Sequence, residues 1–565
     1  MLALLLALSL SPPAVSESVS GYIEKYFETF PSRATEAGRH DRDRELEDLT
    51  PERLLSWVAF NRQTRESLQA ALSSASVSED DRLDGQLVEA RIDWELHELA
   101  IRRRQARDPL FWTNIAGNAT VFLLVRDDRP LPERLSAARA RAGMLPRFCR
   151  QAEAALAATP PAEIAPDLAR VAAGQARASA VFYREGFASL YPPEDRTAVT
   201  REASEAAAAL DRLAAAIDGI ERRATGSPRL GADYREALRA ATGEPDPDAL
   251  LARATADLAA KVHEAAAYGR SVWGQIFAGT EAPASDRELL ARLFARVSAD
   301  RARATEEFVE DYRKQVADLN AFLHAHEVVT LPDPLTLYTD RSPGYFVGQS
   351  VGGVYAAGPY APDARTLWFL PTPPDSATAE QRDGFFRDFN HHFNVMITPH
   401  EILPGHYLQL KVAAHHPRKA RALFPDGTYV EGWGTFCERL MLDLGWGGPL
   451  DRLAHLKKQM ENIARAIVDV RVHTHGMSRD EVIAFVRNDA LQDAQFASNM
   501  WTRAITSPTQ ITTYYIGYTQ VRGLYDDVKS ARGGAFRLKE FMDAMLGRGP
   551  VPVARYREWL LPKSP

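Results

Sequence analysis

Two histidines and a glutamate lie close together in the last third of the 565-residue chain: His400, Glu401 and His406. In the common zinc hydrolase helix, two histidines four residues apart share one face and bind one Zn²⁺. The glutamate after the first histidine then takes a proton from the metal-bound water. The residue types therefore predict a zinc site with His400 and His406 as ligands and Glu401 as general base.

The two histidines are six residues apart, which departs from that pattern. On an unbroken helix, positions six apart lie about 120° from alignment and could not share a metal ion. Pro404 cannot donate a hydrogen bond to the carbonyl of His400, and Gly405 tolerates unusual backbone angles. We therefore expect the helix to bulge at Pro404-Gly405 and to bring His406 beside His400.

The same run also has a purely structural interpretation. Thr398 and Glu401 fit a capping box, and Pro399 between them fits the first position of a helix. A helix that starts at Thr398 would explain Glu401 without any catalytic role.

Two further carboxylates lie seven residues apart on the next predicted helix, which runs from Glu431 to Leu444. Glu431 and Glu438 should share one face of that helix. Glu431 could be the third ligand of a His₂Glu zinc site, with Glu438 orienting one of the histidines. The alternative is that Glu431 belongs to a helix cap with Thr428 and that Glu438 is an ordinary surface residue.

A late helix, predicted to start at Ser507-Pro508, carries a stripe of Gln510, Tyr514 and Gly517. A tyrosine hydroxyl can donate a hydrogen bond to a developing oxyanion, so Tyr514 is a catalytic candidate. Tyr515 and Tyr518 are substitutes for that role, and Gln510 is a further substrate-binding candidate. Aromatic stripes at this spacing also form ordinary hydrophobic cores.

His473 follows Asp469 by four residues on another helical segment. The pair fits a substrate-facing imidazole oriented by a carboxylate, which makes His473 a second candidate for stabilising an oxyanion. It also fits a helix-surface ion pair.

Three segments must position these side chains. Residues 18–327 are rich in Ala, Glu, Arg and Leu with apolar residues at three- and four-residue intervals, which predicts a helical shell interrupted at Pro-rich turns and at 243–247. Residues 328–375 contain the β-type runs 328–331, 335–338 and 366–370, which predict a small sheet. Residues 376–565 are again helical and hold the catalytic candidates. The sequence predicts a mostly α protein of one or two intertwined lobes.

The strand predicted at 366–370 contains Trp368, a substrate-binding candidate. This strand could bind an extended peptide by strand addition, which reads backbone rather than side chains and so suits mixed sequences.

Residues 1–17 are predicted to be a signal peptide, because an apolar run from Met1 to Leu10 precedes the small residues Ala14-Val15-Ser16. This favours export to the periplasm or the medium, although a mis-set start codon or an uncleaved apolar tail would look alike. The run is too short to span a bilayer. Only two cysteines, Cys149 and Cys437, are present, so no disulfide framework is expected.

The charge balance excludes other classes of partner. Lys and Arg number 68 against 75 Asp and Glu, a formal net charge of −7 without long basic runs. Nucleic acid is therefore not an expected partner, and no integral membrane segment is predicted. The oligomeric state is not predicted.

The motifs together resemble a bacterial family, number 885 of the domains of unknown function, which is grouped with the zinc metallopeptidases of the HExxH type. The matching residues are His400-Glu401, Pro404-Gly405-His406, Gln409, Glu431-Gly432-Trp433, Asp469, His473, Gly476, Gln510, Tyr514 and Gly517. More distantly, the last third is similar to thimet oligopeptidase, neurolysin and angiotensin-converting enzyme. That likeness implies a helical clamshell with a deep channel that admits short peptides.

The residues and the resemblance together favour a zinc-dependent peptidase. Zn²⁺ would be bound by His400, His406 and Glu431, with Glu401 as the base and Tyr514 beside the scissile carbonyl. Two alternatives stay open: a helical binding protein of the cell envelope that has lost hydrolysis, and a metal-dependent hydrolase of non-peptide bonds.

Overall fold

The computed structural model describes residues 14–343, 352–374 and 376–562. The protein is mostly α-helical with one three-stranded sheet, so the predicted fold class is confirmed. Most of the predicted signal peptide lies outside the described residues. Its predicted end falls inside the first helix, where Val15 is only 4% exposed.

The part of the chain before the sheet is a succession of helices. The predicted breaks coincide with helix ends: Gly243, at φ +73°, ends α11, and the side chain of Asp246 caps α12 with Pro247 at its first position. The helices are α1 (Val15–Thr29), α2 (Pro31–Glu36), α3 (Pro51–Leu72), α4 (Glu79–Leu96), α5 (Arg104–Arg107), α6 (Pro109–Asn118), α7 (Val121–Val125), α8 (Leu131–Ala157), α9 (Pro166–Val181), α10 (Arg196–Glu221), α11 (Tyr234–Thr242), α12 (Pro247–Ile276), α13 (Asp286–Val297) and α14 (Thr305–Ala325).

The sheet is formed by β1 (Leu337–Arg341), β2 (Gly353–Tyr355) and β3 (Thr366–Leu370) in the order β1-β3-β2. β3 is parallel to β1 and antiparallel to β2. The predicted strand at 366–370 is confirmed, and the one at 335–338 is shifted by two residues. The predicted strand at 328–331 is wrong, because the backbone N–H of Thr330 donates to the carboxylate of Asp543 rather than to a strand.

The rest of the chain is again helical. α20 is the central element of this part: it contacts α12, α13, α16, α19, α22 and α23. The helices are α15 (Ala379–Asp388), α16 (His391–Glu401), α17 (His406–His415), α18 (Lys419–Leu423), α19 (Gly427–Asp443), α20 (Pro449–Thr474), α21 (Arg479–Asn488), α22 (Ala494–Thr506), α23 (Thr513–Arg532), α24 (Leu538–Gly547) and α25 (Val553–Leu560), with the 3-10 turn η7 (Gln510–Thr512) before α23.

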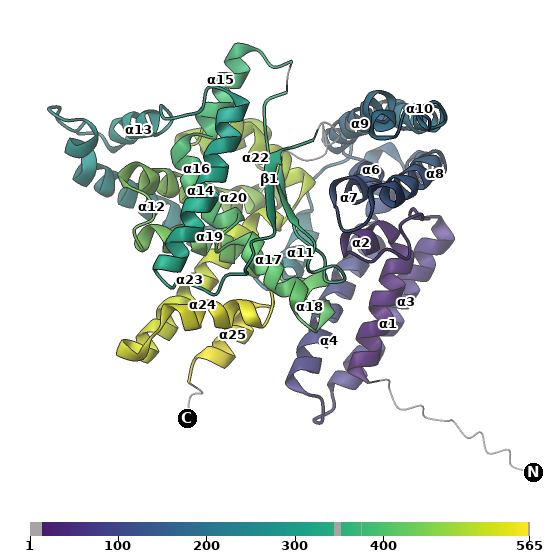
Figure 1. The fold of residues 1–565 in the computed structure, drawn as a ribbon, viewed down its shortest axis with the longest axis horizontal. Helices are drawn as coiled ribbons and strands as arrows, with labels where there is room; N and C mark the ends of the chain where they lie inside the picture. The colour runs from purple at the N-terminus through teal and green to yellow at the C-terminus, as the bar shows by residue number, and fades with distance from the viewer. Residues whose placement is uncertain (1–13, 344–351, 375, 563–565) are drawn as a thin grey trace, which may run out of the picture.

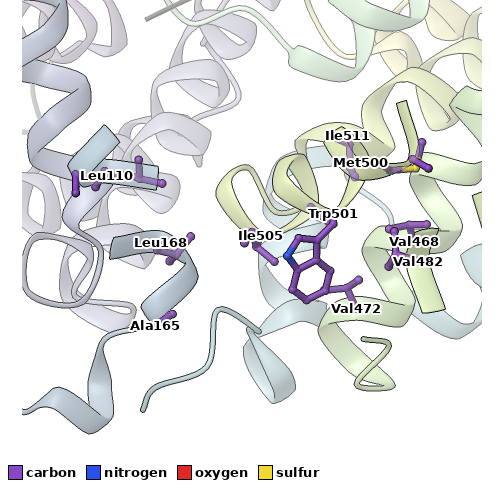
Figure 2. Packing of buried hydrophobic residues seen from close by; sticks show 14 of the residues in the cluster. Leu110, Ala165, Leu168, Val468, Val472, Val482, Met500, Trp501, Ile505 and Ile511 are labelled. Carbon is purple, nitrogen blue, oxygen red and sulfur yellow. The ribbon is translucent and has the colours of Figure 1, made fainter. Parts of the chain in front are cut away.

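The last helix, α25, lies beside α4, where Arg555 donates to the side-chain oxygen of Gln86 over 2.7 Å (Figure 1). The helices α1, α3 and α8 lie on the right of Figure 1 and α12 and α13 on its left, with β1 between them. One cluster of buried apolar residues nevertheless runs from Leu46 to Ile516 and includes side chains of α6, α9, α12, α20 and α22. Figure 2 shows Leu110 and Leu168 from the N-terminal part, and Trp501 and Ile505 from α22. The helices before the sheet and those after it therefore share one hydrophobic core. Among the described residues, no helix is both long and apolar enough to cross a membrane.

Helices α19 and α23 cross with their backbones in close contact at two glycines. A Cβ added to Gly432 would lie 2.3 Å from the carbonyl carbon of Gly517, and one added to Gly517 would lie 2.0 Å from the carbonyl oxygen of Thr428. No side chain fits between the two helices at this point. The crossing fixes α19 against α23, and these two helices carry Glu431 and Tyr514.

We predict that Gly517→Ala lowers the free energy of unfolding by about 1–3 kcal/mol, because the new methyl group must separate two packed backbones. Gly523→Ala on the same helix is the matched control, since a Cβ there meets no atom within 4 Å. It should be neutral or stabilising by up to about 1 kcal/mol, because alanine favours a helix. Denaturant unfolding of both variants measures the difference, and equal stabilities would contradict the close crossing.

Candidate metal centre

The first histidine lies near the end of α16. This helix begins after Asn390, whose side-chain oxygen caps the first turn. Thr398 therefore lies inside the helix, where its hydroxyl donates a hydrogen bond to the carbonyl of Asn394 over 2.9 Å. The capping-box interpretation is wrong, because no helix starts at Thr398. Glu401 is instead the last residue of α16, directly after His400.

A four-residue turn, 402–405, brings the second histidine back to the first. α16 ends at Glu401 and α17 begins at His406, so the chain forms two helices rather than the single bulged helix that we predicted. The turn packs directly on α16, since a Cβ at Gly405 would lie 1.8 Å from the carbonyl oxygen of His400. The ring centroids of His400 and His406 are 4.6 Å apart. The predicted approach of the two imidazoles is confirmed.

Helix α19 supplies the carboxylates. Its N-cap is Asp426, so Thr428 lies within the first turn and is not the cap residue of the alternative interpretation. Glu431 and Glu438 both reach His400, from which their nearest oxygens lie 3.5 Å and 2.7 Å. The prediction that the two glutamates share one face is confirmed.

Three potential ligand atoms converge on one point. Glu431 Oε2 lies 3.5 Å from His400 Nε2 and 3.5 Å from His406 Nε2. The three side chains form the one group of candidate metal ligands found in the part of the chain that the structure describes. Glu401, half-buried beside them, acts electrostatically on His400.

The distances suit a tetrahedral metal ion better than hydrogen bonds. Ligands about 2.1 Å from zinc in a tetrahedron lie about 3.4 Å from one another, whereas good N–H···O hydrogen bonds are shorter. Glu431 Oε2 is also buried and has no hydrogen-bond donor among the described residues. A buried carboxylate oxygen without a donor is costly unless a cation binds it. The donor set and its geometry therefore fit a divalent cation such as zinc.

Glu438 lies behind the histidine, away from the three converging atoms. Its side chain is 0% exposed, and its Oε1 lies 2.7 Å from His400 Nδ1. The other oxygen lies 3.4 Å from Nδ1 of His455, which is also fully buried. A carboxylate that accepts the Nδ1 proton directs Nε2 of the same ring outward as a ligand. This is the position that we predicted for a residue orienting a metal ligand.

Two buried carboxylates give the centre a negative charge. Burial disfavours a protonated His400, but the attraction of Glu431 and Glu438 outweighs burial and raises the pKa of His400 to about 10. Burial alone would raise the pKa of Glu438, but hydrogen bonds and attraction from His400 and His455 outweigh burial and lower this pKa to about 2. Without a metal, a proton on His400 supplies the positive charge that the centre needs.

Tyr514 stands next to this group. Its ring is stacked on His400 with centroids 6.3 Å apart. The Arg465 guanidinium lies 4.3 Å from the centre of the Tyr514 ring, and Arg503 Nη2 donates to the Tyr514 hydroxyl over 3.5 Å and to Gln510 Oε1 over 2.9 Å. Burial and the charge of Glu431 raise the pKa of Tyr514, while the two arginines oppose that rise. The phenol therefore stays a hydrogen-bond donor at neutral pH.

Tyr515 and Tyr518 line a cavity of about 230 Å³ that Tyr514 and Thr435 also line. The Tyr515 hydroxyl donates to Asp257 over 2.6 Å, so Tyr515 is no substitute for Tyr514 as an oxyanion donor. Substrate binding by Tyr518 and Gln510 stays a prediction.

The structure corrects the role predicted for His473. Its Nδ1 accepts from the N–H of Leu230 and its Nε2 donates to the carbonyl of Ala504, and the side chain is 0% exposed. Burial lowers the pKa of His473 to about 4. A neutral ring with both nitrogens bound to backbone cannot contact a substrate.

Asp469 does not orient His473 either, because its Oδ1 lies 3.8 Å from His473 Nε2, too far for a hydrogen bond. It accepts hydrogen bonds from the Tyr234 hydroxyl and from the N–H of Thr509, at 2.6 and 2.9 Å. Thr509 has a φ of +67° and precedes η7. Asp469 therefore holds the turn that leads into the helix of Tyr514.

The predicted contribution of β3 to substrate binding is wrong in two respects. Trp368 is 3% exposed and packs edge-on against Tyr312, so its side chain belongs to the core. β3 is also the central strand, paired on both edges, and it offers no free edge for strand addition.

The residues that sequence reasoning missed are His455, Arg465 and Arg503. The first two lie on α20 in a row of polar residues spaced three or four apart, a pattern that normally marks a solvent-exposed face. α20 is buried on all sides, so that row lies inside the molecule. No sequence signal distinguishes Arg503 from the other arginines of the chain.

Comparisons with known proteins agree on the fold. A family model described as "Bacterial protein of unknown function (DUF885)" matches residues 31–558. A "putative lipoprotein of unknown function" from Shewanella oneidensis has a similar structure, with a TM-score of 0.79 and 23% identity. A "putative lipoprotein" from Colwellia psychrerythraea has a TM-score of 0.79 and 14% identity. Each alignment covers 97% of this chain and 99% of the other. No curated protein matches the chain.

We predict a pH dependence of stability in the metal-free protein. The pKa of His400 is raised from 6.5 to about 10 on folding. Its charged form therefore stabilises the fold fully below pH 6.5, and this contribution is lost as the pH rises from 6.5 to about 10. Glu438→Gln removes one of the attracting charges, so the loss should be smaller in that variant.

Denaturant unfolding between pH 6 and 10 in the presence of a chelator measures this slope. Asp443→Asn is the matched control, because Asp443 lies on the same helix but pairs with Arg439 at the surface. Identical slopes in the wild type and Glu438→Gln would show that the carboxylate does not hold the proton on His400.

Proposed function

We propose that this chain, which belongs to the DUF885 family of bacterial proteins as its sequence resemblance predicted, is a zinc-dependent hydrolase of short peptides. The observation that carries the proposal is the convergence of His400 Nε2, His406 Nε2 and Glu431 Oε2, with the carboxylate oxygen buried and lacking a donor. A cluster that only stabilised the fold would have its polar atoms paired.

The donor set favours zinc over the harder cations. Two imidazoles and one carboxylate form a common catalytic zinc site, in which the fourth position stays open. When bound, Zn²⁺ supplies a Lewis acid that lowers the pKa of a water molecule and polarises a carbonyl group. The order of the ligands along the chain also resembles the thimet oligopeptidase pattern, with Glu431 on a later helix than the histidines.

The chain's own residues can perform the proton transfers of amide hydrolysis. Glu401 follows the ligand His400 and has a half-buried carboxylate, so it can accept a proton from the attacking water and pass it to the leaving amine. The Tyr514 hydroxyl can donate a hydrogen bond to the scissile carbonyl oxygen as negative charge develops there. Glu438 holds the His400 ring in the orientation that this arrangement needs.

We also propose that the protein acts outside the cytoplasm. The apolar run at Met1 to Leu10 supports export, and each of the two similar structures is described as a "putative lipoprotein". Peptides in the cell envelope would then be the substrates.

We predict that the purified protein binds one equivalent of zinc and that Glu431→Gln lowers the affinity at least about 100-fold, since a ligand charge is lost. Metal analysis after dialysis and competition with a chromophoric chelator measure both quantities. Asp443→Asn should bind zinc like the wild type. A wild-type protein without stoichiometric metal would favour the helical binding protein instead.

We predict that Glu401→Gln retains zinc but cleaves peptides about 100- to 10,000-fold more slowly, because the amide cannot accept the proton of the attacking water. Cleavage of a peptide library, followed by mass spectrometry, identifies the substrate for this comparison. Glu380→Gln, an exposed acid on α15, is the control. Equal cleavage by Glu401→Gln and wild type would exclude Glu401 as the base. A zinc-loaded wild type that leaves every peptide intact would favour a hydrolase of non-peptide bonds.

A further inference from the structure

Two arginines lie beside Tyr514, and they differ in their partners. Arg465 is 7% exposed and donates to the Glu461 carboxylate over 2.6 Å and to the side-chain oxygen of Asn462 over 3.1 Å. Its guanidinium is therefore already paired with a carboxylate inside the protein, one that also accepts from Lys458 over 3.1 Å. Arg503 is half-buried and donates to two neutral acceptors, the Gln510 amide oxygen and the Tyr514 hydroxyl.

No carboxylate of the described residues pairs with Arg503. Glu431 and Glu461 act on the charge of Arg503 from a distance, but its hydrogen bonds go only to neutral acceptors. Guanidinium groups bind carboxylates through two parallel N–H···O hydrogen bonds, and such pairs are stronger than neutral ones. The guanidinium of Arg503 therefore suits an anion that comes from outside the chain.

Arg503 is also placed within reach of a substrate at the candidate metal centre. Its Nη2 lies 3.5 Å from the Tyr514 hydroxyl, and the Tyr514 ring is stacked on the ligand His400. The charge of Glu431 acts on both Tyr514 and Arg503. An extended peptide spans about 3.4 Å per residue. One or two residues beyond the scissile bond would bring the end of a peptide from Tyr514 to Arg503.

We propose that Arg503 binds the free C-terminal carboxylate of the substrate, so that this protein removes one or a few residues from the C-terminal end of short peptides. The inference rests on the proposed function and narrows it from hydrolysis of peptides to hydrolysis near a free carboxylate. Arg465, already paired with Glu461, then holds Tyr514 through a contact with its ring.

The test compares one peptide in two forms, with a free C-terminal carboxylate and with a C-terminal amide. The zinc-loaded wild type should cleave the free acid with a kcat/KM about 10- to 100-fold above that of the amide, mainly through KM. Arg503→Gln should bring this ratio close to one, and Arg503→Lys should restore part of it, because lysine keeps the charge but loses the bidentate geometry. Arg487→Gln, an exposed arginine on α21, should leave the ratio unchanged.

Binding gives a second measurement that does not need catalysis. Calorimetry with the full-length Glu401→Gln protein should find the free acid bound about 10- to 100-fold more tightly than the amide, and Glu401→Gln/Arg503→Gln should lose this preference. Suppose that no peptide is cleaved but the free acid still binds more tightly than the amide, and that this difference depends on Arg503. Hydrolysis is then excluded as the function, while Arg503 is supported as a binding site for a carboxylate.

Three results would overturn the inference. The first is that proteins retaining Arg503 cleave or bind the free acid and the amide equally well. The second is that neither peptide binds. The third is that Arg503→Gln loses activity toward both forms of the peptide to the same extent. The last result would show that Arg503 only positions Tyr514. Thermal unfolding of the Arg503 variants checks that the fold is intact, since Gln and Lys can both still donate to Gln510.

Discussion

The structure depends on how the charge of two buried carboxylates is balanced. Glu431 and Glu438 lie one above the other on α19, inside a shell of helices, and His400 lies between them. Buried ions of like sign are tolerated only beside a compensating positive charge. A proton on His400 or a divalent cation can provide it, and a cation has the further advantage that it also satisfies Glu431 Oε2. The same requirement that makes the centre costly to build makes it suited to a divalent cation.

Several features far apart in the chain serve this arrangement. The turn at 402–405 returns His406 to His400, and the contact between Gly432 and Gly517 brings α23 and Tyr514 against α19. Asp469 on α20 holds the turn that precedes Tyr514. Each of these contacts involves a backbone group, and the last two join segments 40 or more residues apart. Together they place side chains from four helices around one point, with no contribution from the sheet.

The sequence predicted the mostly helical fold, the strand at 366–370 and the convergence of His400, His406 and Glu431, because each of these has a recognisable pattern of spacing. It failed where the answer depended on which surfaces are buried. Trp368 and His473 resembled substrate contacts until their burial was known. Arg465 and His455 resembled surface residues, since nothing local shows that α20 is enclosed. The break after Glu401 was predicted as a bulge, because periodicity locates a disturbance in a helix but does not give its geometry.

The apolar core that extends from Leu46 to Ile516 means that the last third of this chain is not a module. α12, which precedes the sheet, covers one side of α20, and α20 in turn supports Tyr514 through Arg465. A shortened gene encoding residues 376–565 alone would leave that side of α20 in water. Gene fusion could therefore not transfer the candidate ligands to another protein without also transferring the helices that support them. Changes in the two parts of the chain must stay compatible during evolution.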